Sequence, residues 1–272
     1  MQEIKVAVSG AYGNMGREVC RAVCEEKGFK LVGAVDVSGE GEDVGQMLGL
    51  EAARGVIIRS NASSLYQEVK PQVVIDFTNP LAVMENIEII ISSGARPVVG
   101  TTGITAPDLE KIKTWLKEEG LGGVIAPNFA LGAVLMMHCA SLCARYMDDV
   151  EIIELHHDGK MDAPSGTAIK TAEMITGEGR EKLSSKKQKQ EEILKLQGAR
   201  GGEKEGVRIH SVRLPGLVAH QEVIFGSLGQ SLTIRHDSYH RRSFMPGIIL
   251  AAKKVLELDS LVYGLENLLV LQ

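Results

Sequence analysis

The first half of this 272-residue chain alternates short β-branched apolar runs with longer stretches of helical character. Strands are expected at residues 4–9, 30–36, 55–59, 72–77, 96–100 and 122–127. Helices are expected between most of them, at 15–27, 80–93 and 106–119. This alternation is typical of a parallel sheet with helices on both faces. The strand runs are apolar throughout, as expected when both faces of the sheet are covered. The pattern therefore predicts an α/β fold with a doubly wound parallel sheet.

The pattern changes close to residue 129. A helix is expected at about 130–146, a strand at 150–157 and another helix from Ser165. Antiparallel strands are expected at 207–214, 219–227 and 230–238, and the last 30 residues have a helical pattern. The stretch 177–206 is rich in Gly, Lys and Glu and is expected to be a surface excursion. We predict a dinucleotide-binding domain of residues 1–128, completed by C-terminal helices at 241–272, and an inserted α+β domain of residues 129–240.

Charge and composition limit the classes of partner. The net charge of −5 does not favour a polyanion, so no nucleic-acid partner is expected. The start lacks the features of a signal peptide, and no apolar run reaches the ~18 residues that span a bilayer. We therefore expect a cytoplasmic protein without a membrane partner. The cysteines form two i, i+4 pairs, Cys20 with Cys24 and Cys139 with Cys143. Neither pair has a second ligand pair of recognised spacing, so buried structural thiols and no metal site are expected.

A glycine-rich turn follows the first expected strand. Gly10, Gly13 and Gly16 stand in G-x-x-G-x-x-G spacing directly before a helix. Glycines at such a turn allow close backbone approach to a phosphate, and the helix N-terminus favours a pyrophosphate. The spacing differs from G-x-G-x-x-G, so a plain tight turn is the alternative. Asp36 ends the second strand, where a carboxylate can accept hydrogen bonds from ribose hydroxyls.

Three further polar turns follow apolar strands, at 77–80, 100–103 and 126–130. In an open parallel sheet these turns share the carboxyl edge, where ligands bind. Together with the glycine turn they predict a Rossmann-like dinucleotide cleft. The segment 37–43 contains three acids and no base, which would repel the 2′-phosphate of NADP. NADH is therefore the expected cofactor, with NADPH as the alternative.

The segment 156–167, "HHDGKMDAPSGT", gathers groups suited to acid chemistry. His156 and His157 point to opposite faces of a strand, so both reach one ligand only if the strand ends there. Ser165 suits a helix N-cap and leaves nearby N–H groups to bind an anion, while Lys160 adds positive charge. An imidazole, which titrates near neutrality, can supply a proton. A structural histidine and an ordinary capped helix are the alternatives, but the combination favours a reductase of a small acid.

At this point the chain resembles a known family. "ELHHDGKMDAPSGTA" is similar to the signature of the 4-hydroxy-tetrahydrodipicolinate reductase (dihydrodipicolinate reductase) family of bacterial lysine and diaminopimelate synthesis. The resemblance covers essentially the whole chain and includes "GAYGNMG", "VVGTTG", "APNFALG" and "RLPGLVAHQEVIFG". It implies NAD(P)H-dependent reduction of a cyclic dicarboxylate, with loss of water and hydride transfer to ring carbon C4. It also implies a homotetramer assembled through the sheet of the second domain, which binds the substrate.

The resemblance assigns roles to individual residues. It implies that His156 is the proton donor and that Lys160 is a second proton donor or a carboxylate partner. The implied substrate-binding residues are His157, Ser165, Gly166 and Thr167. The implied cofactor-binding residues are Gly10, Ala11, Tyr12, Gly13, Asn14, Met15, Asp36, Gly100, Thr101, Thr102, Ala126, Pro127, Asn128 and Phe129. Many members of the family carry Arg at position 14 and a basic residue at position 37, where this chain has Asn14 and Val37. Both differences argue against strong use of NADPH.

Two other functions fit the residues. The first is another two-domain NAD(P)-dependent oxidoreductase of a small carboxylic acid. The second is a non-catalytic NAD-sensing protein, which would bind NADH without turnover. Arg241 and Arg242 stand where the chain re-enters the first domain, as a hinge, a substrate-side cation or a solvated pair.

Overall fold

The computed structural model describes residues 3–177 and 193–269. The chain divides into two compact units. Unit 1 contains the residues up to Leu131 together with those from Arg241 onward, and unit 2 is Gly132–His240. Within the described ranges, no helix is long and apolar enough to cross a membrane.

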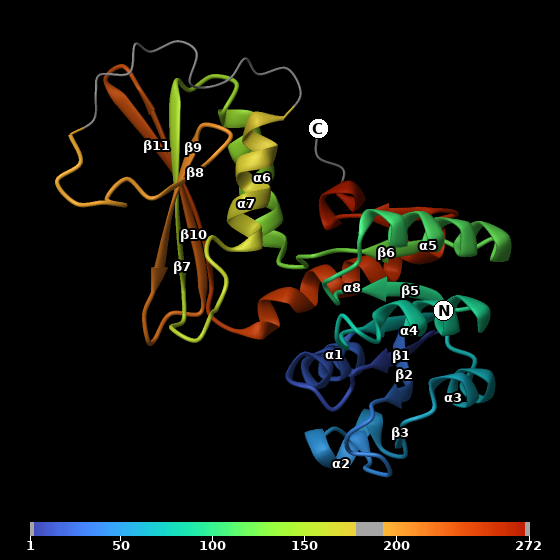
Figure 1. The fold of residues 1–272 in the computed structure, drawn as a ribbon. Helices are drawn as coiled ribbons and strands as arrows, with labels where there is room; N and C mark the ends of the chain where they lie inside the picture. Colours follow the sequence, from blue (N-terminus) through green and yellow to red (C-terminus); the bar gives the residue numbers. More distant parts are fainter. Residues whose placement is uncertain (1–2, 178–192, 270–272) are drawn as a thin grey trace. The chain divides into compact units, whose positions relative to one another are not determined.

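Unit 1 is built on a seven-stranded sheet in the order β12-β6-β5-β4-β1-β2-β3. Every neighbouring pair in this sheet is parallel. The strands are β1 Ile4–Ser9, β2 Phe29–Val35, β3 Ile58–Arg59, β4 Val73–Asp76, β5 Arg96–Val99, β6 Gly123–Ile125 and β12 Leu261–Tyr263 (Figure 1). Strand order reverses between β1 and β4, so ligands are expected at the carboxyl ends of these strands. The predicted doubly wound, Rossmann-like sheet is confirmed.

Helices cover this sheet in two groups. They are α1 Asn14–Glu25, α2 Val44–Leu48, α3 Ala62–Val69, α4 Val83–Ser92, α5 Ala106–Glu119 and α8 Met245–Lys254. Helices α3, α4 and α5 pack side by side, and α1 packs against α8. The strands between them are sealed from water: Val8, Ile75 and Val124 are each 0% exposed. Burial of these β-branched side chains on both faces stabilises the sheet by roughly 1.5–3 kcal/mol per residue.

Two parts of unit 1 differ from the sequence-based expectation. The strand expected at 55–59 is reduced to the two residues Ile58 and Arg59. The C-terminal segment is not wholly helical, because β12 pairs in parallel with β6. The apolar run of β12 has only three residues, too short to show a periodicity of its own. Short 3-10 turns lie at η1 Glu51–Ala53, η3 Arg241–Phe244, η4 Val255–Glu257 and η5 Leu265–Leu268.

Unit 2 contains a five-stranded sheet in the order β11-β10-β7-β9-β8. The strands are β7 Asp149–His156, β8 Gly202–Lys204, β9 Val207–Arg213, β10 Ala219–Ser227 and β11 Gln230–Ser238. Strand β10 is antiparallel to β11, as predicted, and it is also antiparallel to β7. Strand β9, expected among the antiparallel strands, pairs antiparallel with β8 but parallel with β7, because the direction of a partner strand is set by the tertiary connection.

Two helices complete unit 2, α6 Leu131–Cys143, whose first residue still belongs to unit 1, and α7 Gly166–Thr176. The Ser141 hydroxyl of α6 donates to the Met174 carbonyl of α7, so the helices lie side by side (Figure 1). The surface excursion expected at 177–206 contains β8 near its end, while residues 178–192 lie outside the described residues.

The cysteines match the expectation of buried thiols only in part. Cys20 is buried, Cys24 and Cys143 are half-buried, and Cys139 is exposed. Burial raises the pKa of Cys20, so this thiol stays protonated. The expectation is wrong for Cys139 because α6 is apolar on most sides, and its sequence does not specify which face is buried.

Candidate functional site

The glycine turn after β1 brings backbone segments into close contact. Gly10 has a positive φ of 80°, and a Cβ atom there would lie 2.4 Å from the Phe77 carbonyl oxygen. A Cβ atom on Gly16 would lie 1.9 Å from the Gly10 carbonyl oxygen. Helix α1 therefore packs directly on the turn, and its N-cap Gly13 has no side chain to cap the first turn. Such a helix start suits the oxygens of a phosphate.

A cavity of about 690 Å³ opens beside this turn in unit 1. It lies at the carboxyl ends of β1, β2, β3 and β4, at the point where strand order reverses. Its lining residues are Ser9, Gly10, Gly13, Val35, Asp36, Val37, Ser60, Asn61, Ala62, Ser63, Phe77, Thr78, Asn79, Ala82, Glu85, Asn86 and Ile89. Among the described residues that line it, none is basic, while Asp36 and Glu85 are acidic.

Asp36 is held by backbone groups on both carboxylate oxygens. Oδ2 accepts from the Tyr12 N–H at 2.9 Å, and Oδ1 accepts from the Ser38 N–H at 2.9 Å. Each carboxylate oxygen has a second lone pair, so Asp36 can accept further hydrogen bonds from a ribose. The nearby Arg59 is already bound by Glu68, with Nη2 donating to Oε1 at 3.3 Å. Its charge is therefore compensated within unit 1.

A buried carboxylate links two of the polar turns. Asp76 is 0% exposed and accepts from the hydroxyls of Thr101 at 2.6 Å and Thr78 at 2.9 Å. The Asn86 amide donates to it at 3.1 Å. The side chain of Thr101, an expected cofactor contact, thus faces Asp76. Sequence reasoning missed this network, although an aspartate that ends a buried apolar strand requires hydrogen-bond partners and is a usable signal.

The remaining expected cofactor residues differ in their exposure. Gly13, Asn14, Thr102 and Pro127 are exposed, and Tyr12, Met15 and Asn128 are half-buried. Ala11, Ala126 and Phe129 are each at most 1% exposed, so their side chains offer no surface to a ligand. Gly100 is required for packing, since a Cβ atom there would lie 2.2 Å from the Phe77 ring. The turns at 100–102 and 126–129 do not line the described cavity.

In unit 2, strand β7 ends at the predicted histidines. His156 is half-buried, and its Nδ1 lies 2.5 Å from Oε2 of Glu154. His157 follows the strand and is exposed. Glu154 is 0% exposed and lies in phase with the buried residues Val150 and Ile152. A glutamate in the buried phase of a strand needs a charged partner, and this signal was overlooked in the sequence.

Arg213 at the end of β9 is that partner. Its Nη2 and Nη1 donate to Glu154 Oε1 at 2.8 Å and Oε2 at 3.0 Å, a bidentate pair. Burial by itself would raise the pKa of Glu154, but hydrogen bonds from Arg213, Ser211 and His156 outweigh it and lower that pKa. Burial lowers the pKa of His156; the Glu154 carboxylate opposes this effect, and the charges of Lys160 and Arg213 add to it.

The start of α7 lies against the same carboxylate. The Ser165 N–H donates to Glu154 Oε1 at 3.3 Å, and its hydroxyl caps α7 by accepting from the Ala168 N–H at 3.2 Å. Gly166 is exposed, with no atom within 4 Å of the position of a Cβ, and Thr167 is half-buried. The structure thus brings His156, Ser165 and the first turn of α7 together. A helix start of this kind can bind a carboxylate.

Lys160 also lies at this end of β7. Its Nζ is 2.6 Å from Asp162 Oδ1, and this hydrogen bond lowers the pKa of Asp162. The charge of Lys160 acts on His156 as well.

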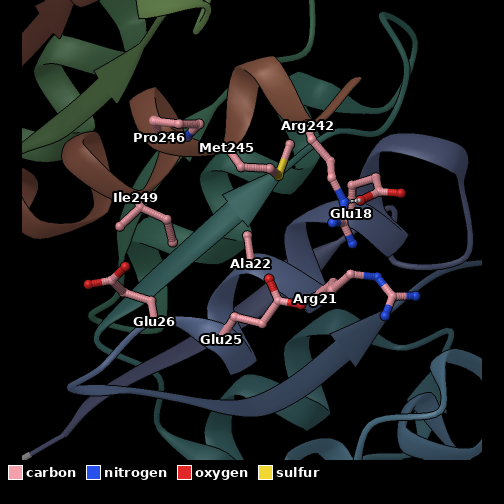
Figure 2. Close-up of a pocket in the computed structure, with 9 residues that line it drawn as sticks. All are labelled: Glu18, Arg21, Ala22, Glu25, Glu26, Arg242, Met245, Pro246 and Ile249. Atoms are coloured by element: carbon pink, nitrogen blue, oxygen red, sulfur yellow. Dashed lines mark hydrogen bonds and ion pairs between the residues drawn. The ribbon is translucent and has the colours of Figure 1, made fainter. Parts of the chain in front are cut away.

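The two arginines at the return to unit 1 are solvent-exposed. Nε of Arg242 donates to Glu18 Oε2 at 3.1 Å, across a surface groove of about 490 Å³ between α1 and α8. Figure 2 shows this ion pair at one end of the groove, with Arg21 and Glu25 further along α1. In unit 1, Arg242 therefore behaves as half of a solvated ion pair.

Comparison with known proteins gives consistent matches over both units. Models described as "Dihydrodipicolinate reductase, N-terminus" and "Dihydrodipicolinate reductase, C-terminus" match residues 4–129 and 132–269. A 4-hydroxy-tetrahydrodipicolinate reductase of Listeria monocytogenes serotype 4b is 50% identical over 266 residues, covering 98% of this chain and 100% of the relative. A 4-hydroxy-tetrahydrodipicolinate reductase of Desulfitobacterium hafniense is 48% identical over 270 residues, covering 99% of this chain and 100% of the relative.

Solved structures agree. The dipicolinate-bound dihydrodipicolinate reductase from Paenisporosarcina sp. TG-14 is 46% identical, with a TM-score of 0.86 over 98% of this chain and 100% of that chain. An amine dehydrogenase from Mycobacterium smegmatis, 14% identical with a TM-score of 0.70 over 100% of this chain and 97% of that chain, shares the fold alone.

Proposed function

Because this chain belongs to the dihydrodipicolinate reductase family, we propose that unit 1 binds NADH in preference to NADPH and that unit 2 binds the cyclic dicarboxylate substrate. The family reaction is the reduction of 4-hydroxy-tetrahydrodipicolinate in lysine and diaminopimelate synthesis. The observation that carries the proposal for unit 2 is the hydrogen-bonded group of Glu154, His156 and Ser165 at the start of α7.

The described residues of unit 1 fit a dinucleotide. A Cβ atom at Gly10 or Gly16 would clash with the backbone of or beside the glycine turn. The N-cap Gly13 has no side chain, so the first N–H groups of α1 are left for a pyrophosphate. Asp36 would accept from the ribose hydroxyls. When bound, the reduced nicotinamide supplies the hydride.

The charges around Asp36 support a preference for NADH. A 2′-phosphate beside Asp36 would meet a carboxylate, and among the described lining residues it would find no cation. Val37 is 90% exposed and supplies no charge at the position where many family members carry a base.

The substrate class follows from unit 2. The solved relative binds dipicolinate, a ring with two carboxylates, and we assign the same chemical class of ligand to this chain. Backbone N–H groups of Gly166 and Thr167 would bind one carboxylate at the start of α7, with Lys160 as a second partner. The exposed His157 would contact the same ligand.

His156 is the proton donor in this proposal. Its Nδ1 faces Glu154, which leaves Nε2 to face the substrate. A histidine that donates a proton in this way contributes typically 10²- to 10⁴-fold to the rate.

The proposed active form is a homotetramer assembled through the sheet of unit 2, working in the cytoplasm. Residues 230–233 of β11, at the edge of that sheet, are exposed and available for contact. Light scattering of the purified protein at micromolar concentration tests this assembly, and a monomeric mass would contradict it.

A coupled assay with freshly generated substrate tests the function, with NADH and NADPH compared side by side. We expect turnover with NADH, and we expect His156→Ala to lower kcat far more than it weakens NADH binding. Equal losses in kcat and in NADH affinity would contradict the assignment of His156 as the proton donor. Binding of NADH without turnover would instead favour an NAD-sensing protein.

A further inference from the structure

We propose that Glu154 is a positioning residue that aligns the proton donor His156 and the anion-binding start of α7 with each other; this rests on the proposed function of His156. The single carboxylate of Glu154 contacts His156, Ser165 and Arg213. Oε2 lies 2.5 Å from His156 Nδ1 and accepts from Arg213 Nη1 at 3.0 Å. Oε1 accepts from Arg213 Nη2 at 2.8 Å and from the Ser165 N–H at 3.3 Å.

Burial explains why Glu154 is fixed. Its side chain is 0% exposed, and an unpaired carboxylate in that position would carry a large desolvation cost. Arg213 offsets this cost with two parallel hydrogen bonds and donates a further one to the Asp162 carbonyl at 2.7 Å. The carboxylate therefore has one position, set by β7 and β9.

A fixed, ionised carboxylate determines the state of the histidine. The ionised carboxylate of Glu154 can only accept a hydrogen bond, so the neutral imidazole of His156 keeps its proton on Nδ1. Nε2 is then the nitrogen that faces the substrate and transfers the proton. The charged groups that act on His156 are Glu154, Arg213 and Lys160, and Asp162 pairs with Lys160 beside them. Without the Glu154 charge, the protonated form of His156 loses its stabilising partner.

The same carboxylate holds the start of α7. Ser165 is 2% exposed and caps this helix while its N–H is bound to Glu154. A second set of hydrogen bonds holds the same part of α7: Gln221 Nε2 donates to Thr171 Oγ1 at 2.7 Å, and the Thr171 hydroxyl donates to the Thr167 carbonyl at 2.7 Å. A shift of Glu154 would thus displace both the proton donor and the carboxylate-binding turn.

Strand β7 provides a matched control in Glu151. This glutamate also contacts an arginine and a histidine: it forms an ion pair with Arg200, and its Oε2 lies 2.8 Å from His210 Nε2. Its side chain is 32% exposed, however, and none of its hydrogen bonds reaches α7. Glu151→Gln removes the same charge from the same strand without touching the proposed site.

The test compares variants in the full-length protein. We expect Glu154→Gln to lower kcat about 10- to 100-fold, the loss seen when partners that orient metal-binding histidines are removed. We expect KM for the dicarboxylate to rise, the dissociation constant of NADH to stay within twofold, and the alkaline limb of the pH profile to move to lower pH. Glu154→Asp, which keeps the charge, should restore part of kcat, and Glu151→Gln should stay within about twofold of the original protein.

A double-mutant cycle separates positioning from a purely structural role. The part of the effect that acts through His156 is read in kcat: Glu154→Gln added to His156→Ala should lower kcat no more than about twofold beyond His156→Ala alone, while KM for the dicarboxylate should still rise through the start of α7. Losses in kcat that multiply would overturn the proposal, and so would a Glu154→Gln variant with unchanged kcat. Should Glu154→Gln fail to fold because Arg213 is left unpaired, the double variant Glu154→Gln, Arg213→Met removes both charges and is measured instead. An inactive original protein would refute the proposed function, whereas an active one that is indifferent to Glu154 would refute this inference alone.

Discussion

The Tyr12 backbone N–H donates a hydrogen bond to Asp36 Oδ2 at 2.9 Å, and so ties the glycine turn after β1 to the end of β2. The Ser38 N–H holds the other carboxylate oxygen. Arg17 lies over the Tyr12 ring, 4.4 Å from its centroid, and Nε donates to the Tyr12 carbonyl at 2.9 Å. The negative charge of Asp36 is therefore fixed beside the ribose position of the proposed cofactor site.

A cation next to Asp36 should change the cofactor preference. Val37 is 90% exposed and lines the cavity, so a longer side chain is accommodated there. We expect Val37→Arg to raise the ratio of kcat/KM for NADPH to that for NADH by about tenfold, because a guanidinium binds a 2′-phosphate bidentately. Steady-state assays with both cofactors measure this ratio.

Val37→Leu is the matched control for that prediction, because it adds bulk without charge. Its cofactor ratio should stay within about twofold of the original value. An equal rise in both variants would show that side-chain size, not charge, controls the preference.

The close packing of α1 on the glycine turn predicts a second effect. Gly16→Ala places a Cβ atom 1.9 Å from the Gly10 carbonyl oxygen, so the turn must move. We expect NADH affinity to fall at least about tenfold and Tm to fall, measured by fluorescence titration and thermal unfolding. Gly226→Ala makes the same chemical change in β10. No atom lies within 4 Å of the position of the added Cβ atom there, so NADH affinity should stay unchanged. Unaltered NADH binding in Gly16→Ala would contradict the proposed role of the glycine turn in binding the cofactor.

The main features of the fold could be predicted because they are encoded locally. Continuous apolar runs indicated the parallel strands of unit 1, and α5 begins at a capping box formed by Thr105 and Asp108. Strand β12 and the direction of β9 could not be predicted in this way. Strand β12 is extended only because β6 accepts it as a neighbour, and β9 takes its direction from β7.

The candidate site divides along the same line. The glycine turn and the segment 156–167 were identified because each gathers its groups within a short stretch of sequence. Arg213 was not identified, since it stands 59 residues from Glu154, and only the register of β7 with β9 brings the two together. Likewise, the bond from the Thr101 hydroxyl to Asp76 was not predicted, because Asp76 stands 25 residues away in the sequence.

That hydroxyl predicts an effect on stability. The Thr101 Oγ1 donates to buried Asp76 at 2.6 Å and accepts from the Thr78 N–H at 2.9 Å. Thr101→Val keeps the shape of the side chain but removes one hydrogen bond from Asp76 and one from the Thr78 N–H. The free energy of unfolding should therefore fall by about 1–3 kcal/mol. Urea unfolding measures the difference. Thr114→Val, at an exposed position of α5, should change it by less than about 0.5 kcal/mol. A Thr101→Val variant as stable as the original chain would rule out this account of the buried network.

The proposed role of His156 as proton donor predicts a pH dependence, and the surroundings of His156 give its sign. Burial lowers the pKa of His156, Glu154 opposes this, and Lys160 and Arg213 add to the lowering. Only the protonated imidazole can donate, and at saturating NADH kcat/KM for the dicarboxylate reports the enzyme–NADH complex before the dicarboxylate binds. Therefore kcat/KM for the dicarboxylate should fall as pH rises, with its midpoint below about 6.5, the ordinary value for histidine. Rates measured from about pH 5 to 9 at saturating NADH test this, and His156→Gln should lack that limb. A limb retained in His156→Gln, or one centred well above the ordinary value, would assign the proton to another group, with Lys160 the first to examine.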